Sequence, residues 1–141
     1  MRLISVFLLH FAFLGILYSA YRIYTEQPVL PSEKDLSIVW DGYHYTNIKN
    51  DGYSYNPARQ SNVAFFPGFP YLWKYSGLNA FGISLINLLL FLTGLFFLVR
   101  EFAIRQRDAL LFLSLPSLFF MFVPYSEALF FAASSILLIG L

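Results

Sequence analysis

The sequence has no cysteine among its 141 residues, and only 12% of its side chains are charged. The absence of cysteine excludes disulfide bonds, thiolate metal sites and a cysteine nucleophile. The net charge is +1, so no broad basic field exists to attract nucleic acid, and we expect no nucleic-acid partner. Soluble domains carry about 25% charged residues. The shortage of charge therefore points to lipid as the solvent for much of the chain.

The motifs of common soluble enzymes are also missing. The sequence has no glycine-rich phosphate loop, no HExxH zinc helix and no GxSxG nucleophile elbow. Two histidines without any cysteine argue against a zinc site built by the protein. We therefore expect neither a metal site nor a cofactor.

Hydrophobic residues make up 58% of the sequence and aromatic residues 21%. They form four apolar stretches, which predict an all-α integral membrane protein with spans at residues 3–21, 78–99, 109–123 and 127–141. The first two have roughly the 20 residues that a bilayer crossing needs. The last stretch reaches the end of the sequence without a polar tail, so we expect a fragment of a longer multi-pass protein.

The first and third of these stretches contain features that allow another interpretation. Arg2 before the first apolar run is also typical of a signal peptide, but cleavage after Ala20 would place Tyr18 where a small residue is wanted, which favours a retained anchor. Pro116 lies inside the third stretch. Proline is tolerated in a span when neighbouring helices satisfy the freed carbonyl, so we expect the span to continue through it.

The distribution of arginine predicts the orientation. The short segment 100–108 holds three arginines and is expected on the cytoplasmic side. Residues 22–77 then form a long non-cytoplasmic loop, and the 124–127 turn lies on that same side. The chain is expected in a bacterial or archaeal cytoplasmic membrane, or in the endoplasmic reticulum membrane of a eukaryote.

The long loop is too aromatic for a disordered linker. A short helix is expected from about residue 42 to residue 50, stopped by the turn pair Asp51-Gly52. A second short helical segment, lying at the membrane interface, is expected around residues 71–75, after the proline-interrupted stretch 67–70. The loop is therefore predicted to be an ordered cap.

Three clusters that could carry chemistry lie on this predicted outer side. The first begins Trp40-Asp41-Gly42-Tyr43-His44-Tyr45 and continues to Ile48 and Gly52-Tyr53; the second is the segment 64–70, and the third is the turn 124–127.

Asp41 and Glu127 are the candidate acids, and each has two interpretations. Asp41 fits an N-cap of the helix that starts near Gly42, and it also fits a general base whose proton affinity is raised by partial desolvation beneath aromatic rings. Glu127 fits the first turn of a helix, where the dipole favours an acid, and it also fits a contact to a polar substrate.

The remaining candidates are cations and rings. His44 could bind a metal or phosphate, or simply make hydrogen bonds at the interface; Arg59 and Lys74 could meet an anionic head group, or simply be solvated. The aromatic residues that we expect to contact substrate are Trp40, Tyr43, Tyr45, Phe65, Phe66 and Tyr125.

Taken in order, the clusters resemble the PIG-V-type mannosyltransferases, which add the second mannose in GPI-anchor biosynthesis, and their prokaryotic relatives. These enzymes belong to the GT-C class of membrane glycosyltransferases. The family's Trp-Asp pair, Ala-Phe-Phe-Pro segment and Pro-Tyr-Ser/Thr-Glu turn correspond to residues 40–41, 64–67 and 124–127. The chain departs from the family at Gly68-Phe69-Pro70, where Leu-Tyr-Pro is usual, at His44, where Trp is common, and in having fewer spans.

The resemblance implies a GT-C-like N-terminal module. It implies that mannose passes from a polyprenyl-phosphate mannose donor to a hydroxyl of a glycan or glycolipid, with Asp41 as the base and with Arg59, Lys74 or His44 stabilising the phosphate. A rival interpretation is a non-catalytic membrane subunit that uses the aromatic loop to bind a partner subunit. A transporter fits less well, because the spans lack paired charges.

Overall fold

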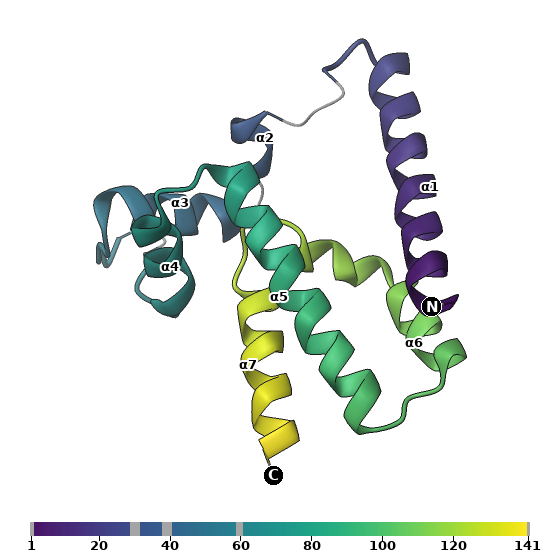
Figure 1. The fold of residues 1–141 in the computed structure, drawn as a ribbon. Helices are drawn as coiled ribbons and strands as arrows, with labels where there is room; N and C mark the ends of the chain where they lie inside the picture. The colour runs from purple at the N-terminus through teal and green to yellow at the C-terminus, as the bar shows by residue number, and fades with distance from the viewer. Residues whose placement is uncertain (1, 29–31, 38–40, 59–60, 141) are drawn as a thin grey trace.

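The computed structural model describes residues 2–28, 32–37, 41–58 and 61–140, and every element within these ranges is helical. Figure 1 shows α1 on one side of the molecule, α5 and α7 side by side in the middle, and α2, α3 and α4 gathered around the beginning of α5. The predicted all-α class is confirmed for these residues. The arrangement separates a long-helix half from an aromatic half made of short helices.

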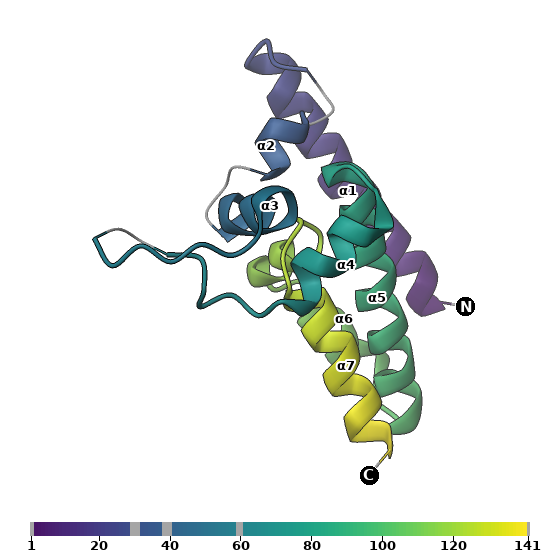
Figure 2. The same ribbon diagram turned by 90° about the vertical axis from the view of Figure 1, so that its left-hand side faces the viewer.

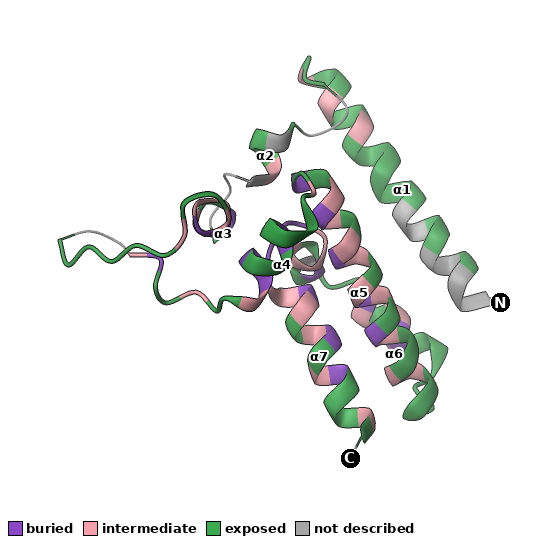
Figure 3. Cartoon of the chain, turned by 60° about the vertical axis from the view of Figure 1, so that its left-hand side comes forward, coloured by how far each residue is buried: buried purple, intermediate pink, exposed green. Residues whose placement is uncertain are grey.

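Helix α1 (Arg2–Tyr24) is continuous over the first predicted span. Its 23 residues correspond to about 35 Å of helix. Glu26 follows with a φ of 55°, a left-handed conformation that ends the helix. The main contact of α1 is with α6, and Figure 3 shows α1 set apart from α5 and exposed over most of its described length.

Helix α3 (Asp41–Asp51) confirms the short helix predicted in the loop and adds one residue at each end. Gly52 has a φ of 85°, and its N–H donates to the carbonyl of Ile48 at 3.0 Å, so the Asp51-Gly52 pair does stop the helix. A short α2 (Glu33–Ser37) precedes α3 and was not predicted. A reciprocal pair of hydrogen bonds between Ser32 and Asp35 starts it.

The segment after α3 is held by Asn62, which is buried. Its Oδ1 accepts from the N–H of Ser54 at 2.8 Å and its Nδ2 donates to the carbonyl of Gly52 at 3.2 Å. Figure 2 shows this segment projecting away from the helices. Helix α4 (Gly68–Ser76) follows and covers the predicted interfacial segment, with Pro70 in its first turn, where no helical N–H is required.

Helix α5 (Ala80–Glu101) corresponds to the second predicted span. The Oδ1 of Asn79 caps it by accepting from the N–H of Gly82 at 2.8 Å. Within the described part of the chain, α5 is the one helix that is long and apolar enough to cross a membrane, judged by length and composition alone.

The prediction of a continuous third span was wrong. Helix α6 (Gln106–Leu113) ends early, Leu115 is extended with a ψ of 125°, and a 3-10 helix, η1 (Pro116–Met121), follows. Pro116 explains the break, because proline lacks the N–H that an α-helix needs and disfavours the α conformation in the residue before it. The chain therefore changes direction where a straight span was expected.

Helix α7 (Glu127–Gly140) occupies the fourth predicted span, but its 14 residues correspond to only about 21 Å. It packs beside α5 in the most extensive helix contact of the described residues. Gly94 allows the close approach: a Cβ placed there would lie 3.0 Å from the Oγ of Ser135. The contact between the two helices thus combines small side chains with the rings of Phe91 and Phe131, whose centroids lie 5.2 Å apart.

Candidate functional site

The structure brings the first and third sequence clusters together. The hydroxyl of Tyr45 on α3 lies 2.7 Å from the Oγ of Ser126, although the two residues are 81 positions apart. Tyr125 is only 3% exposed, and its hydroxyl interacts with the backbone N–H of Gly42 at the beginning of α3. The turn before α7 is therefore docked against the first turns of α3.

The second cluster joins the same group through its rings. Phe65 stacks on the imidazole of His44 with ring centroids 4.7 Å apart, and it meets the ring of Tyr45 edge-on at 5.2 Å. Phe69, in the part of this cluster that begins α4, also packs edge-on against Tyr45 at 5.2 Å. Aromatic pairs in these geometries add roughly 0.5–1.5 kcal/mol each beyond the burial of their area.

The two candidate acids differ in their surroundings. Asp41 is the first residue of α3 and is exposed, so the partial desolvation that we expected for it is not found, and it lies one position inside the helix that it was expected to cap. A carboxylate there is still favoured by the helix dipole. Glu127 is partly buried, and its Oε2 has no hydrogen-bond partner among the described residues.

Glu127 lines a pocket with a volume of about 570 Å³. The other described residues that line it are Phe66, Ser126, Leu129, Phe130 and Ala133. Phe66 is 73% exposed, so much of its ring is accessible to a ligand. The pocket thus combines an apolar wall, an aromatic face, a hydroxyl and a carboxylate whose Oε2 is closed to solvent.

Tyr45 and Tyr125, which lie where the turn before α7 contacts α3, are held in their neutral form. Burial raises the pKa of Tyr45 above its ordinary value of 10.0, and the negative charges of Glu127 and Asp41 act in the same direction, against the lowering effect of the Ser126 hydrogen bond. Burial likewise raises the pKa of Tyr125. Both acids therefore lie close enough to act electrostatically on one tyrosine.

The remaining predicted site residues are exposed or lie outside the described residues. Tyr43 is exposed and touches His44 edge-on, and Lys74 is exposed on α4. Trp40 and Arg59 lie outside the described residues. Among the described residues, no group of three or more histidine, aspartate or glutamate side chains is gathered as a metal site.

Two contributors were missed at the sequence level. Lys49 lies over the ring of Trp73 at 4.6 Å, which ties α3 to α4. Asn87 is fully buried in α5 and donates to the carbonyls of Val123 and Tyr125 at 2.6 and 2.9 Å. The sequence does show Asn87 as a single amide within an apolar helix. Because a buried amide needs hydrogen-bond partners, that pattern could have indicated its role.

Comparison with known proteins gives no relative: no protein-family model matches the chain, and no curated protein or solved structure is significantly similar to it.

Proposed function

We propose that the chain is a GT-C-like module of a membrane mannosyltransferase of the PIG-V type. It transfers mannose from a polyprenyl-phosphate mannose donor to a hydroxyl of a glycan or glycolipid on the non-cytoplasmic face. The proposal rests on the sequence resemblance of the three clusters. The observation that carries it furthest is that Phe66 of the second cluster and Glu127 of the third line one pocket, together with Ser126, whose Oγ lies 2.7 Å from the hydroxyl of Tyr45 in the first cluster.

That pocket suits a sugar. A sugar ring has an apolar face that packs on an aromatic ring and hydroxyl groups that need acceptors. Glu127 would accept a hydrogen bond from a sugar hydroxyl while Phe66 covers the ring. The same pair of side chains suits neither a fully apolar ligand, which would leave the carboxylate unpaired, nor a free anion, which the carboxylate would repel.

The multi-pass arrangement belongs to the proposal. Only 28% of the most apolar 18-residue stretch of α5 is buried. In water, most of this helix would therefore expose leucine and phenylalanine. Figure 1 shows α5 and α7 running in the same direction, so in this proposal the bent α6–η1 segment between them returns the chain across the membrane. The Arg-containing connection between α5 and α6 would then face the cytoplasm.

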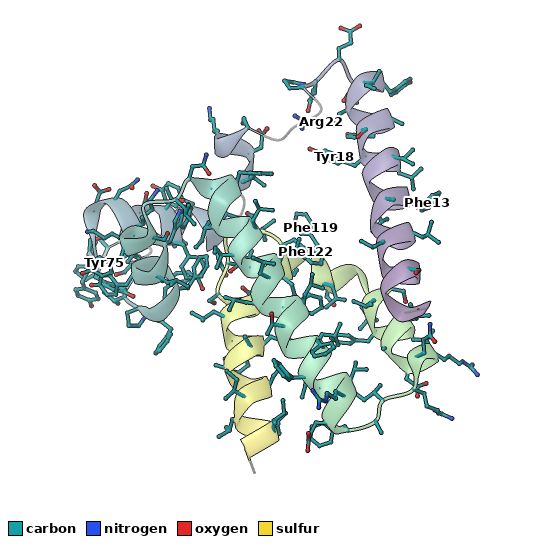
Figure 4. The ribbon with its side chains drawn as sticks, in the orientation of Figure 1. Phe13, Tyr18, Arg22, Tyr75, Phe119 and Phe122 are labelled. Atoms are coloured by element: carbon teal, nitrogen blue, oxygen red, sulfur yellow. The ribbon has the colours of Figure 1, made fainter. Side chains whose placement is uncertain are left out.

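An apolar groove supports contact with lipid chains. It has a volume of about 650 Å³ and lies between α1 and the α5–η1 surface, where Tyr18, Phe119 and Phe122 are among its lining residues. Figure 4 shows Tyr18 pointing from α1 toward this space and Phe13 pointing away from it. In the membrane, such a groove is filled by lipid.

The proposed reaction needs one base and a stabilised leaving group. The acceptor oxygen attacks the anomeric carbon of mannose, the bond from that carbon to the phosphate oxygen breaks, and polyprenyl phosphate leaves with the electron pair. Asp41 takes the proton of the attacking hydroxyl. The leaving phosphate is stabilised by a cation or a hydrogen-bond donor, and Lys74, His44 and Arg59 are the candidates.

A transfer assay tests the proposal. Membranes that contain the chain are given labelled polyprenyl-phosphate mannose, and label is measured in the glycolipid fraction against membranes without the chain. We expect transfer that depends on the chain, and no transfer from a nucleotide-bound mannose. If the chain copurifies with another membrane protein and the complex transfers no mannose, the non-catalytic subunit is the correct interpretation.

A further inference from the structure

Asn87 is the most deeply buried polar side chain that the proposed reaction leaves without a role. It lies in the apolar helix α5 and is 0% exposed. Burying an amide without partners costs roughly 1–3 kcal/mol, so an amide in this place requires a specific interaction. Its Nδ2 has two partners, the carbonyl of Val123 at 2.6 Å and the carbonyl of Tyr125 at 2.9 Å.

These two carbonyls belong to the turn between η1 and α7, where no helical ladder satisfies them. They flank Pro124, which has no N–H to offer. The N–H of Tyr125 also reaches back to the Val123 carbonyl at 2.7 Å, so the backbone is tightly turned here. Carbonyl oxygens only accept hydrogen bonds, which fixes the orientation of the Asn87 amide with its nitrogen toward the turn.

The residues that follow this turn are the ones that reach the site. Ser126 makes the hydrogen bond to Tyr45, and Glu127 lines the pocket. One amide on α5 therefore holds the backbone immediately before both residues. The Oδ1 of Asn87 has no partner among the described residues, so the amide acts on the turn through its nitrogen alone.

We propose that Asn87 is a positioning residue, which fixes the 124–127 turn so that Ser126 and Glu127 meet the α3 side of the site. This inference rests on the proposed function for its activity readout but not for its structural readout. It assigns Asn87 no contact with substrate.

The first test compares two asparagines of the same helix in the full chain. Asn87→Leu removes the amide and keeps an apolar helix, while Asn87→Asp keeps the shape and loses the N–H donors. We expect both to lower kcat for mannose transfer about 10²-fold, because a displacement of about 1 Å has that effect on a positioned group. Asn79→Ala is the control: it weakens the cap of α5 and should lower the melting temperature without lowering kcat.

A structural readout keeps the inference independent of the reaction. Tyr45→Phe and Ser126→Ala are made singly and together, and their effects on melting temperature should be non-additive, since the two hydroxyls are 2.7 Å apart. On the Asn87→Leu background the two effects should become additive. Retained non-additivity on that background, or an unchanged kcat in Asn87→Leu, overturns the positioning role; absence of transfer by the unmodified chain overturns the proposed function alone.

Discussion

The aromatic half of the molecule, α3 and α4, and the helix pair α5 and α7 are held together in different ways. In the aromatic half, large rings with polar tips are buried and their tips are hydrogen-bonded, as the Nε1–H of Trp73 is to the carbonyl of Leu78 at 2.9 Å. In the helix pair, Gly94 allows close backbone approach, the rings that pack, such as Phe91 on Phe131, have no polar tips, and Asn87 is a buried amide. The first half suits a wet interface; the second suits lipid, where close packing replaces the hydrophobic effect.

The comparison explains why the site lies where the halves meet. Tyr45 belongs to the first half, and Ser126 and Glu127 belong to the second. The helix pair supplies Glu127 at the start of α7, and the aromatic loop supplies Asp41 and the rings. Within the helix pair a buried polar side chain needs its own partners, as Asn87 has in the carbonyls of Val123 and Tyr125 and Ser135 has in the carbonyl of Phe131.

The largest stability effect is expected in the aromatic half. Trp73 is 1% exposed, and Trp73→Ala removes its ring, the hydrogen bond to Leu78 and the contact with Lys49. We expect a loss of about 3–5 kcal/mol in the free energy of unfolding, measured by thermal or denaturant unfolding in detergent. Tyr75→Ala on the same helix is the control, since Tyr75 is 82% exposed and lies at the outer edge in Figure 4; an equal loss there would refute the buried role of Trp73.

A smaller loss is expected from crowding the helix pair. A Cβ at position 94 would already lie 3.0 Å from the Oγ of Ser135 and 3.2 Å from the ring of Phe131, so Gly94→Val should cost about 1–3 kcal/mol. Gly15→Val on α1 meets nothing within 4 Å and serves as the control. Similar melting temperatures for the two variants would show that α5 and α7 are not packed as described.

The smallest effect is a pH dependence at the junction. The raised pKa of Tyr45 means that the unfolded chain ionises at this tyrosine before the folded chain does. The stabilisation is complete below pH 10.0 and is lost as the pH rises toward the folded pKa, so melting temperature should fall on the alkaline side. Tyr45→Phe should make that fall shallower. A variant that melts in parallel with the unmodified chain across alkaline pH would contradict the burial of this hydroxyl.

Local sequence signals predicted the local structure well. The helix in the loop, its stop at Gly52 and the extent of α5 follow from turn residues, caps and apolar length, all of which act over a few neighbouring positions. Pro116 was misjudged. Its effect depends on whether neighbours can satisfy the freed backbone, and here the chain turns into a 3-10 helix instead.

The candidate site was predictable only in part. The sequence order of the clusters led to the expectation that they share one face, but it could not provide the 2.7 Å contact between Tyr45 and Ser126, which depends on how α7 docks. It also assigned desolvation to Asp41, whereas Glu127 is the partly buried acid. Burial of a carboxylate is a property of tertiary packing, and a motif read along the chain does not contain it.

The most direct measurement of the proposed function compares Asp41→Asn with Asp41→Ala in the mannose transfer assay. Asparagine keeps the shape of the side chain at the start of α3 and loses only the interaction of its charge with the helix dipole, so the fold should survive, but it cannot accept a proton at neutral pH. We expect Asp41→Asn and Asp41→Ala to lower the transfer rate by a similar factor of about 10²–10⁴, with a melting temperature that changes by only a few degrees in either variant. Near-full transfer by Asp41→Asn would contradict the assignment of Asp41 as the base and would move that role to Glu127.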